Sequence, residues 1–171
     1  MKTSTSKLPT GSIIVMQEVN RTLSSRKSLE VTEQGSWLYN NPDDEIYETP
    51  HGKGNIIELV FMPPIIKAVS AKQIQKTLMD FGLDPDPRAQ AAYNADNPNF
   101  TDDHANITVW SGEDGKLYAQ KFYQYGFDDP QSTVEVIRSR GSDKYNGWWI
   151  CGSRRLEPQA LYHFSVGHLK K

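Results

Sequence analysis

Four strand-like segments in close succession, within residues 107–155, constrain the fold of this chain more than any other feature. Each segment is rich in β-branched or aromatic residues, and short polar or glycine-containing links separate them. The stretch also holds three of the four tryptophans and four of the eight tyrosines. We expect antiparallel strands at 107–110, 116–125, 133–139 and 147–154, with the last two paired as a hairpin.

The segment 71–81 carries the clearest helix signal in the chain. Ser70 and Gln73 have the spacing of a capping box, in which each side chain binds the backbone N–H of the other residue. Apolar residues then recur at i, i+4 and i+7 and line one face. Gly82 follows where a left-handed C-cap is needed, and the next prolines prevent continuation. A second short helix is expected at 88–95, because proline precedes a run of helix formers.

Other strands are expected on either side of these helices. Residues 11–19 and 55–62 carry β-branched and apolar runs, and Pro63 and Pro64 end the second run because proline cannot donate to a sheet ladder. The 55–62 run is nearly continuous in apolar residues, which is typical of a central strand. Shorter strands are expected at 29–32, 37–39, 45–48 and 161–168.

The order of these elements favours one α+β domain over residues 11–171, because the chain shows no internal repeat and no βαβ alternation. We expect mostly antiparallel sheet, with the 71–81 helix and the 88–95 helix packed on one face. A chain of 171 residues is about one domain long, and its 11% aromatic residues offset a low hydrophobic content of 37%. The small polar residues at 1–10 predict a flexible N-terminal arm.

The apolar runs and the cysteine content bear on location. The longest apolar run, 56–66, falls far short of the ~20 residues that span a bilayer, and the N-terminus lacks the pattern of a signal peptide. The single cysteine, Cys151, cannot form an internal disulfide, which favours a reducing compartment. We therefore expect a soluble cytoplasmic protein without membrane contact, and the sequence leaves its oligomeric state open.

The net charge of −2 conceals two oppositely charged segments. Residues 84–115 hold seven acids against Arg88 alone, a net charge of −6. Residues 132–171 hold seven bases against three acids, a net charge of +4. Such a chain can present two differently charged faces. Alternatively, the acidic 84–114 and basic 138–155 segments neutralise each other in the fold.

The expected last hairpin combines cations with aromatic rings. Guanidinium groups bind phosphates with two parallel hydrogen bonds, and exposed rings stack on bases. This pattern predicts a site for nucleic acid or another polyanion. The alternative interpretation is a buried aromatic strand with solvated arginines at its ends. The candidate ligand-binding residues are Arg138, Arg140, Lys144, Tyr145, Trp149, Arg154 and Arg155.

Histidine chemistry has one candidate, His163. The run His163-Phe164-Ser165-Val166 is similar to one copy of the H-x-[ST]-hydrophobic motif of the two-histidine phosphoesterases, in which two such histidines act as base and acid. Neither His51 nor His104 supplies a second copy. The acidic loop 96–104 lacks an EF-hand pattern, and no phosphate-binding glycine loop or G-x-S-x-G elbow is present. We expect no metal or cofactor, and the sequence favours a non-enzymatic role.

Three classes of function follow from these features. The first is a binding module for nucleic acid or another polyanion, acting through the 138–155 hairpin. The second is a protein-interaction, inhibitor or immunity-type accessory protein of a phage, plasmid or bacterium, which uses the acidic 84–114 segment to hold a basic protein partner. The third is a small phosphodiester hydrolase that uses His163.

Overall fold

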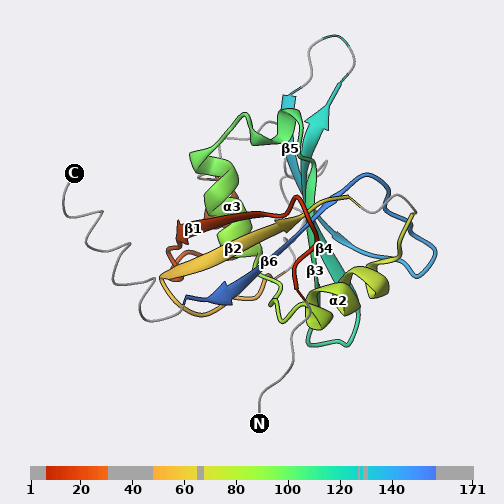
Figure 1. Cartoon of the computed structure of the whole chain (residues 1–171), viewed down its shortest axis with the longest axis horizontal. Coiled ribbons are helices and arrows are strands. Elements are labelled where there is room, and N and C mark those ends of the chain that lie inside the picture. The colour runs from red at the N-terminus through yellow and green to blue at the C-terminus, as the bar shows by residue number, and fades with distance from the viewer. Residues whose placement is uncertain (1–6, 31–47, 65–67, 127, 129–130, 157–171) are drawn as a thin grey trace, which may run out of the picture.

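The computed structural model describes residues 7–30, 48–64, 68–126, 128 and 131–156. Within them, six strands form one mixed sheet in the order β1-β2-β6-β3-β4-β5 (Figure 1). The strands are β1 (Ile13–Glu18), β2 (Ile56–Met62), β3 (Asn106–Ser111), β4 (Leu117–Tyr125), β5 (Gln131–Arg138) and β6 (Trp149–Arg155). The helices are α1 (Ser25–Glu30), α2 (Ala71–Asp80), α3 (Pro87–Asp96) and the 3-10 helix η1 (Phe100–Asp102).

The predicted α+β class is confirmed: the sheet is mostly antiparallel, and only β3 and β6 run parallel. The expected strands at 11–19, 55–62, 107–110, 116–125, 133–139 and 147–154 match observed strands, and both expected helices are present. The strands expected at 37–39 and 161–168, and most of that at 45–48, lie outside the described residues. None of the described helices is long and apolar enough to cross a bilayer.

The strand expected at 29–32 is wrong in its described part, because Leu29 and Glu30 end helix α1. The Ser24 hydroxyl accepts a hydrogen bond from the Lys27 backbone N–H at 3.1 Å, which caps the helix. Leu29 is fully buried in one cluster with Trp110 and Phe122. Local capping and this contact together outweigh the β-propensity of the segment.

The expected hairpin between 133–139 and 147–155 is also wrong. Strand β6 pairs antiparallel with β2 and parallel with β3, whereas β5 pairs, among the described residues, with β4. Ile150 packs in the core on one face of the sheet and Cys151 in the core on the other. A strand buried on both faces belongs in the sheet centre. Residues 139–148, here called the crossover, carry the chain back to that position.

The α-helices cover opposite faces of the sheet, although the sequence predicted the 71–81 and 88–95 helices on one face (Figure 1). Alternate residues of β2 separate the two faces, with Val60 packing in the cluster that contains Ile74 and Leu78 of α2. Its neighbour Leu59 packs in the cluster that contains Ala89 of α3. We call these the α2 face and the α3 face.

Both ends of α2 follow the predicted capping pattern. The Ser70 hydroxyl accepts from the Gln73 backbone at 3.2 Å, and the Gln73 side chain accepts from the Ser70 backbone at 2.7 Å. Gly82 adopts φ 68°, a left-handed conformation in which glycine avoids the Cβ clash. The Leu83 N–H then binds the Leu78 carbonyl at 2.8 Å, and Leu83 is buried against the helix.

Helix α3 meets the sheet through a buried amide network rather than an apolar stripe. The Gln90 side chain donates to Asn106 Oδ1 at 2.9 Å and accepts from Gln120 Nε2 at 3.0 Å. Asn106 in turn donates to Asn94 Oδ1 at 3.2 Å. All four residues are buried. Because each amide has partners, the network avoids the cost of an unpaired buried polar group and fixes the helix position on the sheet.

Gly152 sits where α2 and the following turn press onto β6. A Cβ at this position would lie 2.6 Å from Leu78 Cδ2, 2.9 Å from Leu83 Cβ and 3.1 Å from the Asp84 carbonyl oxygen. Gly152→Ala should therefore destabilise the fold by about 1–3 kcal/mol through overpacking. Urea unfolding followed by tryptophan fluorescence measures this. Gly141→Ala is the control, because a Cβ there meets nothing within 4 Å, and equal stability of the two variants would contradict the packing.

Candidate functional site

The predicted basic-aromatic residues occupy three separate parts of the fold. Arg138 lies opposite Tyr118 on β4, at the end of β5. Arg140 and Lys144 lie in the crossover. Trp149 is the first residue of β6, and Arg154 and Arg155 are its last two. Because β6 has seven residues, its two ends lie about 20 Å apart. These seven side chains do not form one patch, because the hairpin expected to join them does not exist.

Both aromatic members of that set contribute to the protein interior. Tyr145 is 6% exposed and packs in the α2-face core. Its hydroxyl lies 2.7 Å from Ser139 Oγ, and burial raises the pKa of its phenol. Trp149 is half-buried on the α3 face, edge-on to His104 at 4.9 Å. The Tyr145 ring is therefore not available to stack on a base, and one edge of the Trp149 ring is occupied by His104.

The two arginines at the end of β6 differ in their partners. Arg154 donates to Glu58 on the neighbouring strand at 2.7 Å from Nε, and this ion pair is half-exposed. Arg155 is exposed and forms no ion pair with a described residue. Lys53 lies near these arginines, at a cavity of about 340 Å³ that also contacts Asp84. This end of the sheet therefore mixes cations with acids.

A different group of rings and cations gathers on the α2 face. Lys121 Nζ lies 5.6 Å from the ring centroid of Tyr123 and 5.6 Å from that of Trp148. Tyr123 packs edge-on against Trp148 at 5.6 Å and against Tyr125 at 6.3 Å. Tyr125 is 68% exposed. We call Lys121, Tyr123, Tyr125 and Trp148 the β4 aromatic patch.

One carboxylate, that of Glu135, partly offsets the positive charge of Lys121 in this patch. Glu135, opposite Lys121 on β5, lies 3.9 Å from the lysine Nζ and accepts a hydrogen bond from the Tyr123 hydroxyl. Sequence reasoning missed the patch. Its signal was present, because Lys121, Tyr123 and Tyr125 alternate along one strand and so share a face.

The crossover carries two further exposed cations, and it starts near the beginning of β4, where the Ser139 backbone N–H donates to the Leu117 carbonyl at 2.9 Å. Tyr145 bridges to Val69 just before α2 and is buried in the α2-face core, and the half-buried Trp148 packs against the outside of that core. Arg140 and Lys144 are exposed and make no ion pair with a described residue. The carboxylate of Asp143 instead accepts from the Arg140 backbone N–H at 2.8 Å. Arg138 faces the α3 side, because it alternates with Ile137, which packs on the α2 face.

The acidic and basic segments do not neutralise each other through ion pairs. Among the described residues, no salt bridge joins an acid of 84–114 to a base of 138–155. Asp86 pairs with Arg21, and Arg154 pairs with Glu58. The charges of the two segments are therefore not paired with each other within the part of the chain that the structure describes.

Asp86 accepts more hydrogen bonds than any other carboxylate in the described part of the chain. Its carboxylate is buried and accepts hydrogen bonds from Arg21 at 2.6 and 2.8 Å, from Ser153 Oγ at 2.7 Å and from the Ala89 backbone at 3.1 Å. The last bond caps helix α3. Arg21 also donates to backbone carbonyls within 51–54. One carboxylate thus joins α3, β6 and two loops.

Arg88 fixes the adjoining segments from inside the protein. Its side chain is completely buried and donates to Thr49 Oγ1 at 2.9 Å, to Ser25 Oγ at 3.3 Å and to the Leu23 carbonyl. Burial lowers the pKa of the guanidinium, and Glu48, 3.7 Å away, opposes that shift. The Arg88 guanidinium therefore has a structural role, because it donates its hydrogen bonds to oxygen atoms of the protein.

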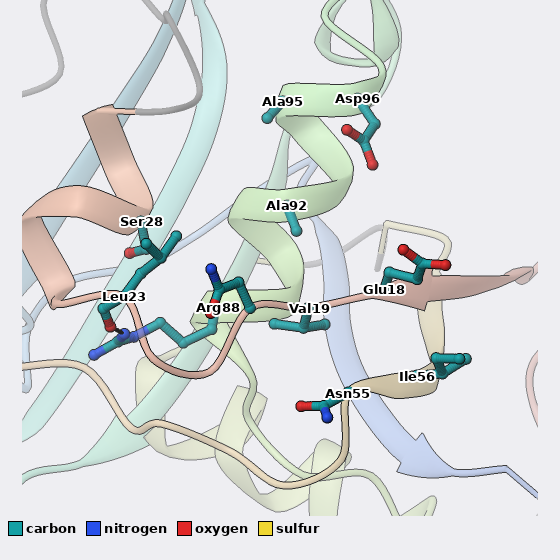
Figure 2. Close-up of a pocket in the computed structure, with 11 residues that line it drawn as sticks. Glu18, Val19, Leu23, Ser28, Asn55, Ile56, Arg88, Ala92, Ala95 and Asp96 are labelled. Carbon is teal, nitrogen blue, oxygen red and sulfur yellow. Dashed lines mark hydrogen bonds between the residues drawn. The ribbon is translucent and has the colours of Figure 1, made fainter.

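A cleft of about 590 Å³ runs between α3 and the chain after β1 (Figure 2). Glu18 and Asp96 lie at one end, Arg88 and Leu23 at the other, and Ala92 lies between them. Asp96 accepts from Gln17 Nε2 at 3.0 Å. Arg88 and Asp96, at the two ends of the cleft, already form hydrogen bonds with other residues of the protein. The surface between them that a ligand would meet is therefore mainly apolar.

The described histidines and the cysteine do not form a reactive centre. His104 stacks on Phe100 at 4.4 Å, and no group of three or more His, Cys, Asp or Glu side chains in the described part of the chain could hold a metal ion. Cys151 is fully buried, and burial raises the pKa of its thiol well above the usual value. His163 lies outside the described residues, so the hydrolase hypothesis stays a prediction.

Comparisons with protein families, with curated proteins and with solved structures find no match for this chain. We therefore infer its function from the geometry and chemistry of its own side chains.

Asp86 and Asp84 form a natural pair for testing the buried network. Asp86→Ala should destabilise the protein by about 3–5 kcal/mol, because it leaves the largely buried Arg21 without its partner and removes the α3 cap. Asp84→Ala should change stability by less than about 0.5 kcal/mol, because the Asp84 side chain is exposed and its bonds to Ser153 are backbone bonds. Chemical denaturation measures both variants. A similar stability for the two would show that the network contributes little.

Proposed function

We propose that this protein is a non-enzymatic binding module that engages single-stranded nucleic acid, or another polyanion, through the α2 face. The contact surface is the β4 aromatic patch with Arg140 and Lys144 of the crossover. The observation that supports this most strongly is the gathering of three rings and a lysine at the end of a strand, outside the buried core. The proposed class of ligand is the one predicted from the sequence, but the proposed site is the β4 aromatic patch with Arg140 and Lys144 instead of the expected 138–155 hairpin.

The rings suit bases rather than apolar ligands. Base stacking on an aromatic side chain contributes about 1–3 kcal/mol per base and tolerates any base, because every base has a π-face. Tyr125 is the most accessible of the three rings, whereas Tyr123 and Trp148 are half-buried. Tyr125 therefore offers the ring on which a base would stack, and Tyr123, which itself packs on Trp148, supports that ring from the protein side.

The cations suit phosphates. Arg140 and Lys144 carry no ion pair within the described structure, so no protein carboxylate has to be displaced when they meet a phosphate. Lys121 is held between two rings and Glu135 and contributes less. With about two to three phosphates neutralised, the log–log slope of affinity against salt should be near −2 for a single strand.

The proposed setting is the cytoplasm. The single cysteine is free and buried, so the described fold does not depend on an oxidising compartment. Nucleic acid or another polyanion is the proposed partner there.

Stacking is tested by Tyr125→Ala. The change should weaken binding of a fluorescein-labelled oligo-dT about 5- to 100-fold, as expected for the loss of one stacked base. Fluorescence anisotropy at ~50 mM salt measures the affinity. The control is Met79→Ala, which removes another exposed apolar side chain, 73% exposed, from helix α2. Equal binding by the two variants, or no binding by the unaltered protein, would contradict the proposal.

The position of the cationic surface is tested by two charge reversals of equal size. Arg140→Glu with Lys144→Glu should weaken oligonucleotide binding more than tenfold and reduce the magnitude of the salt slope by about 1.4, the value expected for two lost phosphate contacts on a single strand. Lys53→Glu with Arg155→Glu changes the net charge equally at the other end of the sheet and should have a smaller effect. If the second pair abolished binding and the first did not, the ligand would lie near the end of β6.

A further inference from the structure

A second cleft, on the α3 face, has a different chemistry. It has a volume of about 540 Å³ and lies between residues 48–51 and the turn that joins β3 to β4. Three carboxylates line it, from Glu48, Glu113 and Asp114, together with the rings of Trp110 and Tyr118. We call it the acidic cleft.

Trp110 lines this cleft and carries a buried hydrogen-bond donor without a partner among the described residues. Its side chain is 2% exposed and stacks with Tyr118 at 6.2 Å between ring centroids, which holds the indole in one orientation. Among the described residues, its Nε1 and the Thr108 hydroxyl are the buried side-chain polar atoms without a hydrogen-bond partner. Trp110 lines the cleft whereas Thr108 does not. A buried donor without a partner is unfavourable, so a ligand that presents an acceptor to it gains affinity.

The carboxylates give the cleft a negative charge. Asp114 accepts from the Tyr118 hydroxyl at 2.5 Å and from the Lys116 backbone at 3.0 Å, and these bonds hold the pKa of its carboxyl below the usual value. Glu113 is exposed and forms no ion pair with a described residue. Arg138, the cross-strand neighbour of Tyr118, does not pair with either acid.

Charge and hydrogen bonding together select the ligand. The acids repel phosphates and attract guanidinium or ammonium groups, while the indole N–H requires an oxygen acceptor. A peptide segment with a basic side chain supplies both, because the cation and a main-chain carbonyl belong to the same residue.

We propose that the acidic cleft binds an arginine- or lysine-bearing segment of a protein partner, with the cation against Glu113 and Asp114 and a main-chain carbonyl of the segment accepting from Trp110 Nε1. This interaction is separate from polyanion binding, because Trp110 packs in the α3-face core with Phe122 whereas the β4 aromatic patch lies on the α2 face. The module would thus hold a polyanion on one face and a basic protein on the other.

The indole proton of Trp110 provides a direct test. In a ¹⁵N–¹H correlation spectrum the four tryptophans give four indole resonances, and Trp110→Phe identifies the one that belongs to Trp110. Titration with a blocked tripeptide of glycine, arginine and glycine should move that resonance in a saturable way. A blocked peptide with glutamate in place of arginine should leave it unmoved.

Two double variants that change the net charge by the same amount test whether the peptide cation contacts Glu113 and Asp114. Glu113→Gln with Asp114→Asn should weaken arginine-peptide binding roughly fivefold, as expected for the loss of two exposed ion pairs. Asp102→Asn with Asp103→Asn neutralises two exposed acids of the same segment that do not line the cleft, and should leave the affinity unchanged. Glu113→Gln alone is a further check, because it preserves the Asp114 bonds that order the turn.

Three results would overturn the proposal. They are a Trp110 resonance that does not respond to the arginine peptide, equal weakening by the two double variants, and a response to a neutral trisaccharide but not to the peptide, which would indicate a carbohydrate site. None of these affects oligonucleotide binding at Tyr125, so failure here is distinguishable from failure of the proposed nucleic-acid function.

Discussion

The buried carboxylate of Asp86 is the interaction on which the rest of this fold depends. It caps α3, binds Ser153 on β6 and holds Arg21, whose guanidinium in turn fixes residues 51–54. Removing one member of such a network is costly because the remaining charge stays buried. Arg88, on the first turn of α3, extends the same role to Thr49 and Ser25. Polar contacts thus add to the apolar packing of Ala89 and Ala91 in holding α3 and the loops beside it.

This distribution explains why the surfaces are left with unbalanced charge. The buried charges, Asp86 and Arg88, are used internally, whereas Arg140 and Lys144 in the crossover and Glu113 and Asp114 at the acidic cleft have no ion pair among the described residues. The sheet separates them, since its α2 face carries the crossover and its α3 face carries the acidic cleft. A single-sheet module with two covered faces can therefore serve two ligands of opposite charge.

Local features of the fold could be predicted from the sequence, and long-range ones could not. The capping box at Ser70 and the left-handed Gly82 depend on neighbouring residues, so their pattern is sufficient. The place of β6 depends on contacts with β2, nearly a hundred residues away, which no local pattern encodes. The expected ligand site failed for that reason, because Tyr145 is buried in the core and Trp149 packs, half-buried, on the α3 face. The β4 aromatic patch was readable from alternation along 117–125, but its exposure was not.

Hydrogen–deuterium exchange of the protein with and without an oligonucleotide tests the central claim most directly. The account predicts new protection in 121–125 and 140–148, the β4 aromatic patch and the crossover, with no change in 48–51 or 112–118. Protection confined to the acidic cleft, or to the cations at the end of β6, would contradict it.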